Sequence, residues 1–363
     1  MNSLIESLKK VNDFRRKQGQ KYPLWLILLI VILGLMAGHL EYRALGDFAK
    51  SQQILLKKYF HLRSLKTPSY STIRRTMMGV DWSNLMDVFN QWSSQLAIGD
   101  EECQWLAIDG KSLKSTVENH QNSQQNFVSI ISVFCQKNGL VLHLSRIENK
   151  NKSELHQVQD IARDSGIHDR VFTLDALHCQ KQTVQAISEG GNDYLIAVKK
   201  NQLTLYKSLK NISETATPLS QNLTQDISHG RNICRKVSVF ELPDSIKSLW
   251  TNSQRFIQIE RSGTRGGKPY QEVAYQLSSC QENAQIFAES IRGHWGIENK
   301  LHWVKDVIFK EDKSRLHQFQ PVTNFSILST IAINLFRILG FLSITEGRRW
   351  LGERFSLLTI LLA

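Results

Sequence analysis

The 363-residue sequence predicts an α/β protein with an all-α N-terminal region and a β-rich insertion. Three observations support this fold class. Apolar residues recur at helical spacing through residues 1–95. From residue 104 the pattern changes to short β-rich runs that alternate with helical ones as far as residue 200. Residues 201–284 are mostly β-like again, and helix signals resume at Asn283. We therefore expect four consecutive regions, which comprise residues 1–95, 96–200, 201–284 and 285–363.

The N-terminal region contains one apolar run, residues 23–38, which follows several basic residues and so resembles a signal anchor. A helix needs about 20 apolar residues to span a bilayer, and this run has 16. We interpret it as a helix buried in the protein core and keep membrane insertion as the alternative. A second apolar run, 325–344, is interrupted by Asn334 and Arg337, which also favours a core helix.

A further N-terminal helix begins at Pro68 and Ser69, which together form a helix start signal. Arg74 and Arg75 fall in its second turn. Such a helix can lie against phosphates or enter a DNA groove. The alternative is an ordinary solvated helical face.

The region after residue 104 has the predicted order strand, strand, strand, helix, strand, helix, strand. Ser153 is the expected N-cap of the first of these helices, and Gly166 follows its end. The segments, in chain order, are 104–113, 126–135, 139–147, 153–166, 169–177, 179–191 and 193–200.

The composition indicates a polyanionic partner. Lys and Arg number 45 against 33 Asp and Glu, a formal charge of +12. Such a surplus favours nucleic acid or an anionic membrane, although a generally basic soluble protein remains an alternative. The five cysteines are scattered and form no CxxC pair, so we expect neither a disulfide framework nor a zinc site, and a reducing cytosol fits best.

Two aspartates, Asp109 and Asp175, are each predicted to lie at the C-terminal end of an apolar strand, where open α/β sheets bind ligands. A carboxylate there costs free energy unless it is paired or binds a cation. With a third carboxylate, Glu298 from a helix, the set could hold two divalent cations about 3.5 to 4 Å apart for phosphoryl transfer. The alternatives are turn or capping aspartates and a surface glutamate.

The stretch "IRGHWGIENKLHWVKD", residues 291–306, places Glu298 between two tryptophans. Lys305 follows Glu298 by seven residues, so on an α-helix both share a face and the lysine could hold a DNA phosphate near the metals. Further candidates for phosphate contacts are His294, Arg292, Lys181, Lys199 and Lys200, and each lysine could equally be a plain surface residue. His178 and Cys179 suggest a zinc ligand pair or a nucleophile, but no second pair stands at zinc spacing.

Four motifs in order, "LAIDGKSLKST", "TLDALHCQKQT", "DYLIAVKKNQ" and "RGHWGIENKLHWVKDVIFKED", resemble DDE transposases of bacterial insertion sequences. Within these the sequence is most similar to the ISAs group, which includes the H-repeat-associated proteins. The resemblance implies a ribonuclease H-like catalytic domain in two parts, 96–200 and 285–363. It also implies that the region 1–95 is a helical DNA-binding domain and that Asp109, Asp175 and Glu298 form the metal-binding triad.

The broader clan carries the signature Tyr-x2-Arg-x3-Glu-x6-Lys on the helix of its glutamate. This sequence keeps Glu298 and Lys305 at that spacing, but has His294 at the Arg position and Ile291 at the Tyr position. Arg292 is a possible substitute for the Arg. The triad therefore matches the clan, whereas the residues that grip the DNA strand depart from it.

The resemblance implies a transposase that cuts element ends and joins them to target DNA, using Mg²⁺ or Mn²⁺, most simply two ions. The expected partner is double-stranded DNA, both terminal inverted repeats and target, with a homodimer where two ends are brought together. The expected location is the cytoplasm, on the nucleoid, with no membrane. Three alternatives stand beside it: a nuclease without strand transfer, an inactive remnant that only binds DNA, and a membrane protein resting on residues 23–38 alone.

Overall fold

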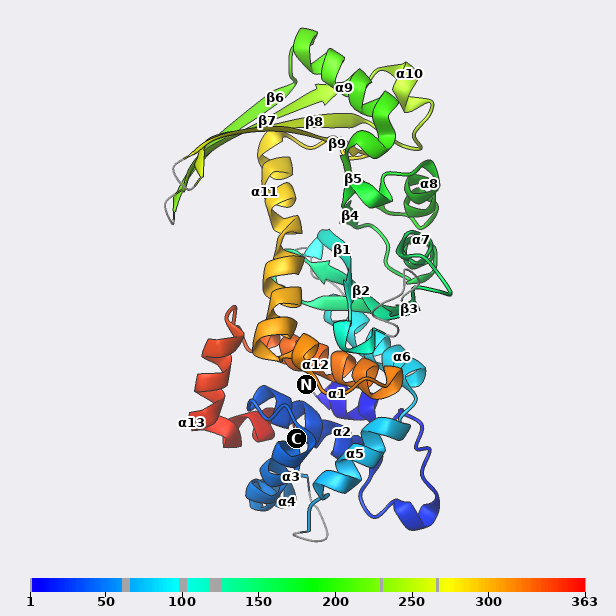
Figure 1. Cartoon of the computed structure of the whole chain (residues 1–363), viewed down its shortest axis with the longest axis vertical. Coiled ribbons are helices and arrows are strands. Elements are labelled where there is room, and N and C mark those ends of the chain that lie inside the picture. The colour runs from blue at the N-terminus through cyan, green and yellow to red at the C-terminus, as the bar shows by residue number, and fades with distance from the viewer. Residues whose placement is uncertain are drawn as a thin grey trace.

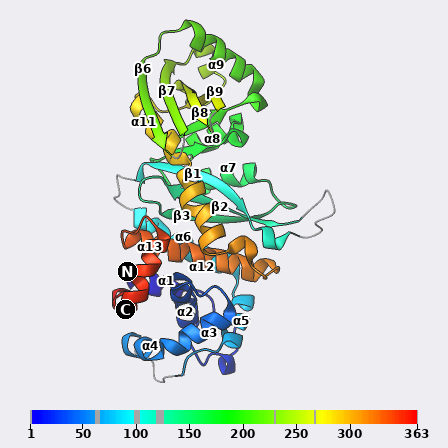
Figure 2. The same cartoon turned by 60° about the vertical axis from the view of Figure 1, so that its left-hand side comes forward.

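A computed structural model describes residues 2–60, 66–97, 103–117, 126–228, 231–265 and 268–362. The molecule is elongated, with the N-terminal helices at one end, the first five strands in the middle and the remaining strands at the other end (Figure 1). A long helix that begins with α11 runs beside the sheet and links the strand-rich end to the helical end, as a second view also shows (Figure 2).

The described part of the N-terminal region contains helices and no strand. Its apolar run forms α2, Leu24–Met36, whose side chains are almost all buried. The stretch Lys17–Met36 is long and apolar enough to cross a membrane, but two thirds of its apolar window is enclosed by the protein. The structure thus makes this run a core helix. The other helices of the region are α1 Asn2–Leu8, α3 Tyr42–Ser51, α4 Gln53–Tyr59, α5 Tyr70–Gly79 and α6 Trp82–Ser94.

The helical region shares its hydrophobic core with the C-terminal helices α12, Phe319–Ile338, and α13, Ile344–Leu362. Phe336 of α12 and Phe89 of α6 belong to this core, together with one face of the first strands. Within α12, Asn334 is buried because its side chain bonds both the N–H and the C=O of Val141 at a strand edge. The predicted second core helix is therefore confirmed, and its polar residue is satisfied by the sheet.

A single nine-stranded mixed sheet has the order β3-β2-β1-β4-β5-β9-β8-β7-β6. Strand β1 pairs antiparallel with β2 and parallel with β4, and β4 pairs parallel with β5. Helices α7, Glu154–Asp164, and α8, Lys181–Glu189, cover one face of these strands. The strands are β1 Trp105–Ser112, β2 Val128–Cys135, β3 Val141–Glu148, β4 Val171–Leu174 and β5 Asp193–Val198.

The insertion extends this sheet because β9 pairs antiparallel with β5. Its elements are α9 Leu203–Thr215, β6 Ser220–Ser228, β7 Arg231–Glu241, α10 Asp244–Lys247, β8 Arg255–Arg265 and β9 Lys268–Ser278. Strand β6 was not anticipated, because "SQNLTQDIS" lacks an apolar alternation. The long strands curve over the start of α11, Ala284–His294 (Figure 1).

The helix beyond α11 departs from α geometry. Residues Glu298–His302 and Val304–Ile308 are π-helical, with hydrogen bonds that skip one more residue than in an α-helix. Because each π turn contains more residues, seven residues no longer complete two turns. We call the continuous helical segment 284–308 the glutamate helix.

Two of the cysteines form a disulfide, contrary to the expectation from their spacing. Cys135 ends β2 and pairs with Leu106 near the start of β1, and Cys103 precedes that strand. The antiparallel register brings the Cα atoms of Cys103 and Cys135 to 5.5 Å, within the usual range for a disulfide. The pairing depends on strand register, which residue spacing alone does not show.

Candidate active site

Asp109 and Asp175 lie on neighbouring parallel strands, as expected. The pairing of β1 with β4 ends at Ala107 and Thr173, so Asp109 and Asp175 both follow the last paired residues by two positions. Asp175 comes directly after β4, but Asp109 is inside β1 rather than at its end. Strand β1 continues because β2 pairs with it as far as Ser112. The two acids nevertheless emerge at the same level of the sheet.

The glutamate helix adds Glu298 to this edge. The pKa of Asp109 is raised to about 7, chiefly by burial; the charges of Glu154, Asp175 and Glu298 contribute to the rise, and the backbone N–H of Gly110 opposes it. Charges act on one another in this way only at short range in a protein. The charges of the two other predicted acids, and of Glu154 as a fourth, therefore all act on Asp109. We call Asp109, Glu154, Asp175 and Glu298 the acidic site.

The acidic site has little basic compensation. Within the described ranges, no Lys or Arg forms an ion pair with any of its four acids. Two histidines are near: Nδ1 of His302 is 3.5 Å from Oδ2 of Asp109, and His178 contacts Glu154 and Asp175. Burial lowers the pKa of His302 to about 3, so its ring is neutral at pH 7 and does not offset the acids.

Glu154 was not anticipated from the sequence. It is the first residue of α7, directly after the N-cap Ser153. The sequence signal was an acid in the first turn of the helix that connects β3 to β4, but such acids commonly stabilise the helix dipole and are not distinctive. Only the packing of α7 beside β1 reveals the proximity of Glu154 to Asp109.

Lys305 does not take the place expected for it. Its side chain is 2% exposed, and its Nζ donates a hydrogen bond of 2.9 Å to Oγ of Ser326 in α12. The same Nζ is 3.9 Å from Glu311. The prediction that Lys305 positions the scissile strand is therefore wrong for this conformation. The reason is the π-helical backbone, which turns residue 305 away from the face of Glu298 and into the core.

A second charged cluster lies two residues beyond Asp109 on β1. Nζ of Lys111 is 2.7 Å from Asp306, 3.1 Å from Asp312 and 3.7 Å from Glu311. Lys114 also pairs with Asp312, at 2.8 Å. These contacts join β1 to the end of the glutamate helix and the turn that follows it. We call this set, with Lys305 behind it, the lysine network.

His294 also faces inward. Its Nδ1 is 2.9 Å from Oγ1 of Thr173 and shares a hydrogen bond with it, which ties the glutamate helix to β4. Burial lowers the pKa of His294, and the charge of Asp175 raises it. The contact of His294 is thus with β4, and its role in DNA contact stays a prediction. The remaining residues predicted to contact DNA are exposed: Arg292, Lys181, Lys199, Lys200, Arg74 and Arg75.

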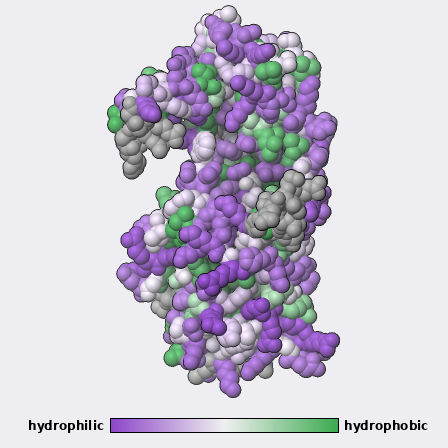
Figure 3. All heavy atoms as spheres, in the orientation of Figure 1, coloured by the Kyte–Doolittle hydropathy of each residue, from purple (hydrophilic) through white to green (hydrophobic). Residues whose placement is uncertain are grey.

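A groove lies between the glutamate helix and the curved strands of the insertion. Its volume is about 1020 Å³, and it appears as a notch below the overhanging strand ends (Figure 3). Basic side chains from both walls line it, namely Arg235, Arg261, Arg292 and Lys300, with Asp226 and Glu289 among them. Trp295 at its edge is 55% exposed, and Trp303 further along the helix is 52% exposed.

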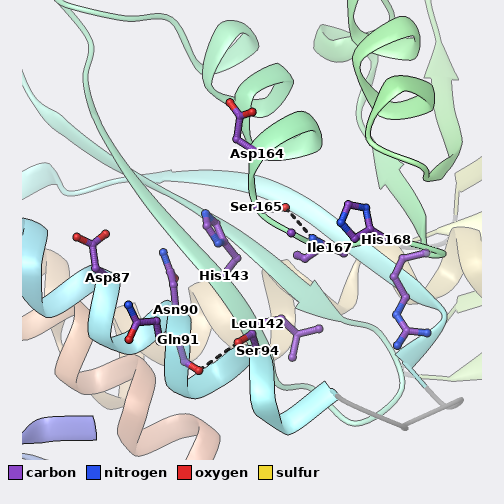
Figure 4. Close-up of a pocket in the computed structure, with 12 residues that line it drawn as sticks. Asp87, Asn90, Gln91, Ser94, Leu142, His143, Asp164, Ser165, Ile167 and His168 are labelled. Atoms are coloured by element: carbon purple, nitrogen blue, oxygen red, sulfur yellow. Dashed lines mark hydrogen bonds between the residues drawn. The ribbon is translucent and has the colours of Figure 1, made fainter. Parts of the chain in front are cut away.

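Another cavity, of about 510 Å³, is bounded by α6, β3 and the end of α7 (Figure 4). Its lining includes Asp87, His143 and His168. Burial lowers the pKa of His143 to about 4, so that ring is neutral at pH 7. None of the residues predicted for catalysis or DNA contact is among those that line it. The groove beside the glutamate helix is lined by one of the residues predicted to contact DNA, Arg292, but by none of the four acids.

Comparison with known proteins places this geometry in a family. Residues 104–335, which contain all four acids, match the model of the transposase DDE domain, and residues 5–93 match the DDE_Tnp_1-associated model. This chain belongs to the DDE transposase family. Its matched region begins just before β1 and ends within α12.

Relatives extend the match over most of the chain. "H repeat-associated putative transposase YhhI" of Escherichia coli (strain K12) is 27% identical over 92% of this chain and 90% of its own length. "Putative transposase YncI" of Escherichia coli O157:H7 is 29% identical over 93% of this chain and 88% of its own length. These findings confirm the resemblance inferred from the four sequence motifs.

Proposed function

We propose that this protein is a DNA transposase that cuts the ends of an insertion sequence and joins them to target DNA. The observation that carries the proposal is the acidic site, in which the charges of Asp175 and Glu298 act on Asp109 and no Lys or Arg of the described chain pairs with these acids. The order β3-β2-β1-β4-β5 with acids at β1 and β4 supports a ribonuclease H-like catalytic domain.

The acids fit a divalent cation by their chemistry. Carboxylate oxygens are the ligands that Mg²⁺ and Mn²⁺ prefer, and a cation would keep Asp109 ionised despite a pKa of about 7. In the described residues no three acids, histidines or cysteines are yet close enough to hold one ion. Asp175 and Glu298 are exposed, so their side chains can turn toward Asp109 at small cost.

Two bound cations would supply an activated water or 3′-hydroxyl and would stabilise the leaving oxygen. The protein's own part is to place the strand. Arg292 and Lys300 in the groove can hold its phosphates, and the exposed rings of Trp295 and Trp303 can stack on unpaired bases. Arg74 and Arg75, exposed on α5, are candidates for contacts with the element end.

Lys181, Lys199 and Lys200 are exposed close after β4 and β5 and are further candidates for phosphate contacts. Synapsis of two element ends would require at least a homodimer. The surplus of 12 positive charges suits a protein of the bacterial cytoplasm that binds the nucleoid.

The test first searches the DNA on both sides of the gene for inverted repeats, and then uses a duplex that carries such a repeat with a labelled 3′ end. The full chain in Mg²⁺ should nick at the repeat boundary and then join that end to a second duplex. A chelator should abolish both steps. Nicking without joining would favour a nuclease, and binding without nicking would favour an inactive remnant. Cleavage in chelator would contradict the proposed chemistry.

A further inference from the structure

Glu154 lies against the backbone next to Asp109. Its Oε2 is 2.7 Å from the position that a Cβ atom on Gly110 would occupy, and its Oε1 is 3.1 Å from the same point. Any side chain at position 110 would collide with this carboxylate. Gly110 therefore leaves the space that Glu154 fills, one residue from Asp109.

A buried histidine connects Glu154 to Asp175. The side chain of His178 is 1% exposed, and its Nε2 is 3.4 Å from Oε1 of Glu154 and 3.9 Å from Oδ1 of Asp175. Its Nδ1 has no hydrogen-bond partner in the described part of the chain. A buried ring whose polar contacts are two carboxylates orients both of them, as second partners do around metal ligands.

A purely structural role does not account for these contacts. An acid in the first turn of a helix interacts favourably with the helix dipole, but that interaction requires neither the space at Gly110 nor the contact with His178. Within the described ranges the ion pair of Glu154 is with His178, and neither Lys nor Arg neutralises it. Its side chain is 28% exposed, so a cation can reach it.

We propose that Glu154 is a fourth metal-binding carboxylate of the acidic site, and that Gly110 admits it while His178 orients it. The inference rests on the proposed function, because it concerns the same cations. Glu154 adds oxygen ligands on the α7 side of Asp109, opposite the side approached by the glutamate helix.

The experiment is a titration of the full chain with Mn²⁺, followed by electron paramagnetic resonance of the free ion. Glu154→Gln keeps the size of the side chain but removes its charge, and should weaken Mn²⁺ binding by at least about tenfold. Asp160→Asn on the same helix is the matched control and should bind as the unaltered protein does. Thermal unfolding in chelator should show that both variants are folded.

Gly110→Ala gives an independent readout. The added methyl group meets the movable end of Glu154, so the backbone can stay in place while the carboxylate is displaced. We expect this variant to weaken Mn²⁺ binding as Glu154→Gln does, and the double variant to be no weaker than either single one.

The outcomes separate the two proposals. Unchanged Mn²⁺ affinity in Glu154→Gln, with a clear loss in Asp109→Asn, would overturn the role of Glu154 and leave the proposed function standing. Unchanged affinity in Asp109→Asn as well would contradict the metal site itself. An equal loss in Asp160→Asn would show a general effect of charge and would also overturn the inference.

Discussion

Two groups of acids lie side by side along β1 and the glutamate helix, and they differ in compensation. In the lysine network, Asp306, Glu311 and Asp312 surround Lys111, whose side chain is 9% exposed. In the acidic site, two residues back along the same strand, no lysine or arginine of the described chain pairs with Asp109. The strand side chains at 109 and 111 point to the same face, so the contrast arises from the partners.

The contrast distinguishes a cluster that joins elements of the fold from one that we propose to be functional. Buried acids with matched cations hold elements together, here β1 and the segment after the glutamate helix. In the acidic site, burial and the charges of the neighbouring acids raise the pKa of Asp109, and such a raised pKa is common at functional sites. Burial and neighbouring acids also raise the pKa of Asp306 in the lysine network, so the two clusters differ in their basic partners: Lys111 pairs with Asp306, whereas no Lys or Arg of the described chain pairs with Asp109.

The largest effect should follow from Asp109→Asn, which removes the central anionic oxygen of the acidic site. Cleavage of end DNA should fall roughly a thousandfold, equivalent to about 4 kcal/mol of transition-state stabilisation. Binding to the same DNA should change little. Single-turnover cleavage rates and titrations check this, with Asp160→Asn as control. An Asp109→Asn protein that cuts at the normal rate would contradict the assignment.

Lys111→Met should act on stability. It leaves three partly or fully buried acids without their main cation, which costs about 3 to 5 kcal/mol when a buried pair is broken. Lys114→Met is the matched control, because Lys114 is 73% exposed and should cost about 1 kcal/mol or less. Urea unfolding at pH 7 measures both. Equal small losses would mean that the lysine network is not structural.

The pH dependence of stability should show the free-energy cost of ionising Asp109 in the folded protein. The pKa of Asp109 is about 7 in the folded protein and near 3.8 when unfolded, so ionisation opposes folding. The penalty is absent below about pH 4, grows between the two pKa values and is complete above about pH 7. In chelator, Asp109→Asn should therefore gain stability over the unaltered protein as pH rises from 4 to 8. A difference that does not vary with pH would contradict the shifted pKa.

The smallest effect concerns the exposed arginines of α5. Arg74→Ala with Arg75→Ala should flatten the salt dependence of binding to end DNA by about one unit for each phosphate that the protein no longer neutralises. Cleavage at saturating protein should hardly change, because these residues lie on the N-terminal helices and not at the acidic site. Lys207→Ala with Lys210→Ala, exposed on α9, is the control of equal charge. If both double variants flatten the salt dependence of DNA binding equally, the effect is one of general charge and not of Arg74 and Arg75.

The sequence predicted most elements because each has a clear local signal. The apolar runs of β1 to β5 and the N-caps Ser69 and Ser153 appear where expected, and both caps accept hydrogen bonds from the first turn. Long-range register was not predictable in the same way. The disulfide of Cys103 with Cys135 depends on how β1 and β2 are aligned.

The candidate site was predictable in part. Asp109, Asp175 and Glu298 could be selected because their strand and helix contexts are local features. Lys305 could not be placed, because the expected α-helical spacing fails where the backbone becomes π-helical. Glu154 comes to the site only through the packing of α7, and Lys111 pairs with residues about 200 positions away.

Stabilisation by Mg²⁺ tests the difference between the two acid clusters most directly. A ligand at a hundred times its dissociation constant should stabilise the folded protein by about 2.7 kcal/mol. We predict this gain for the unaltered protein and, from a lower baseline, for Lys111→Met, but not for Asp109→Asn. The same gain in Asp109→Asn, or its loss in Lys111→Met alone, would contradict the account.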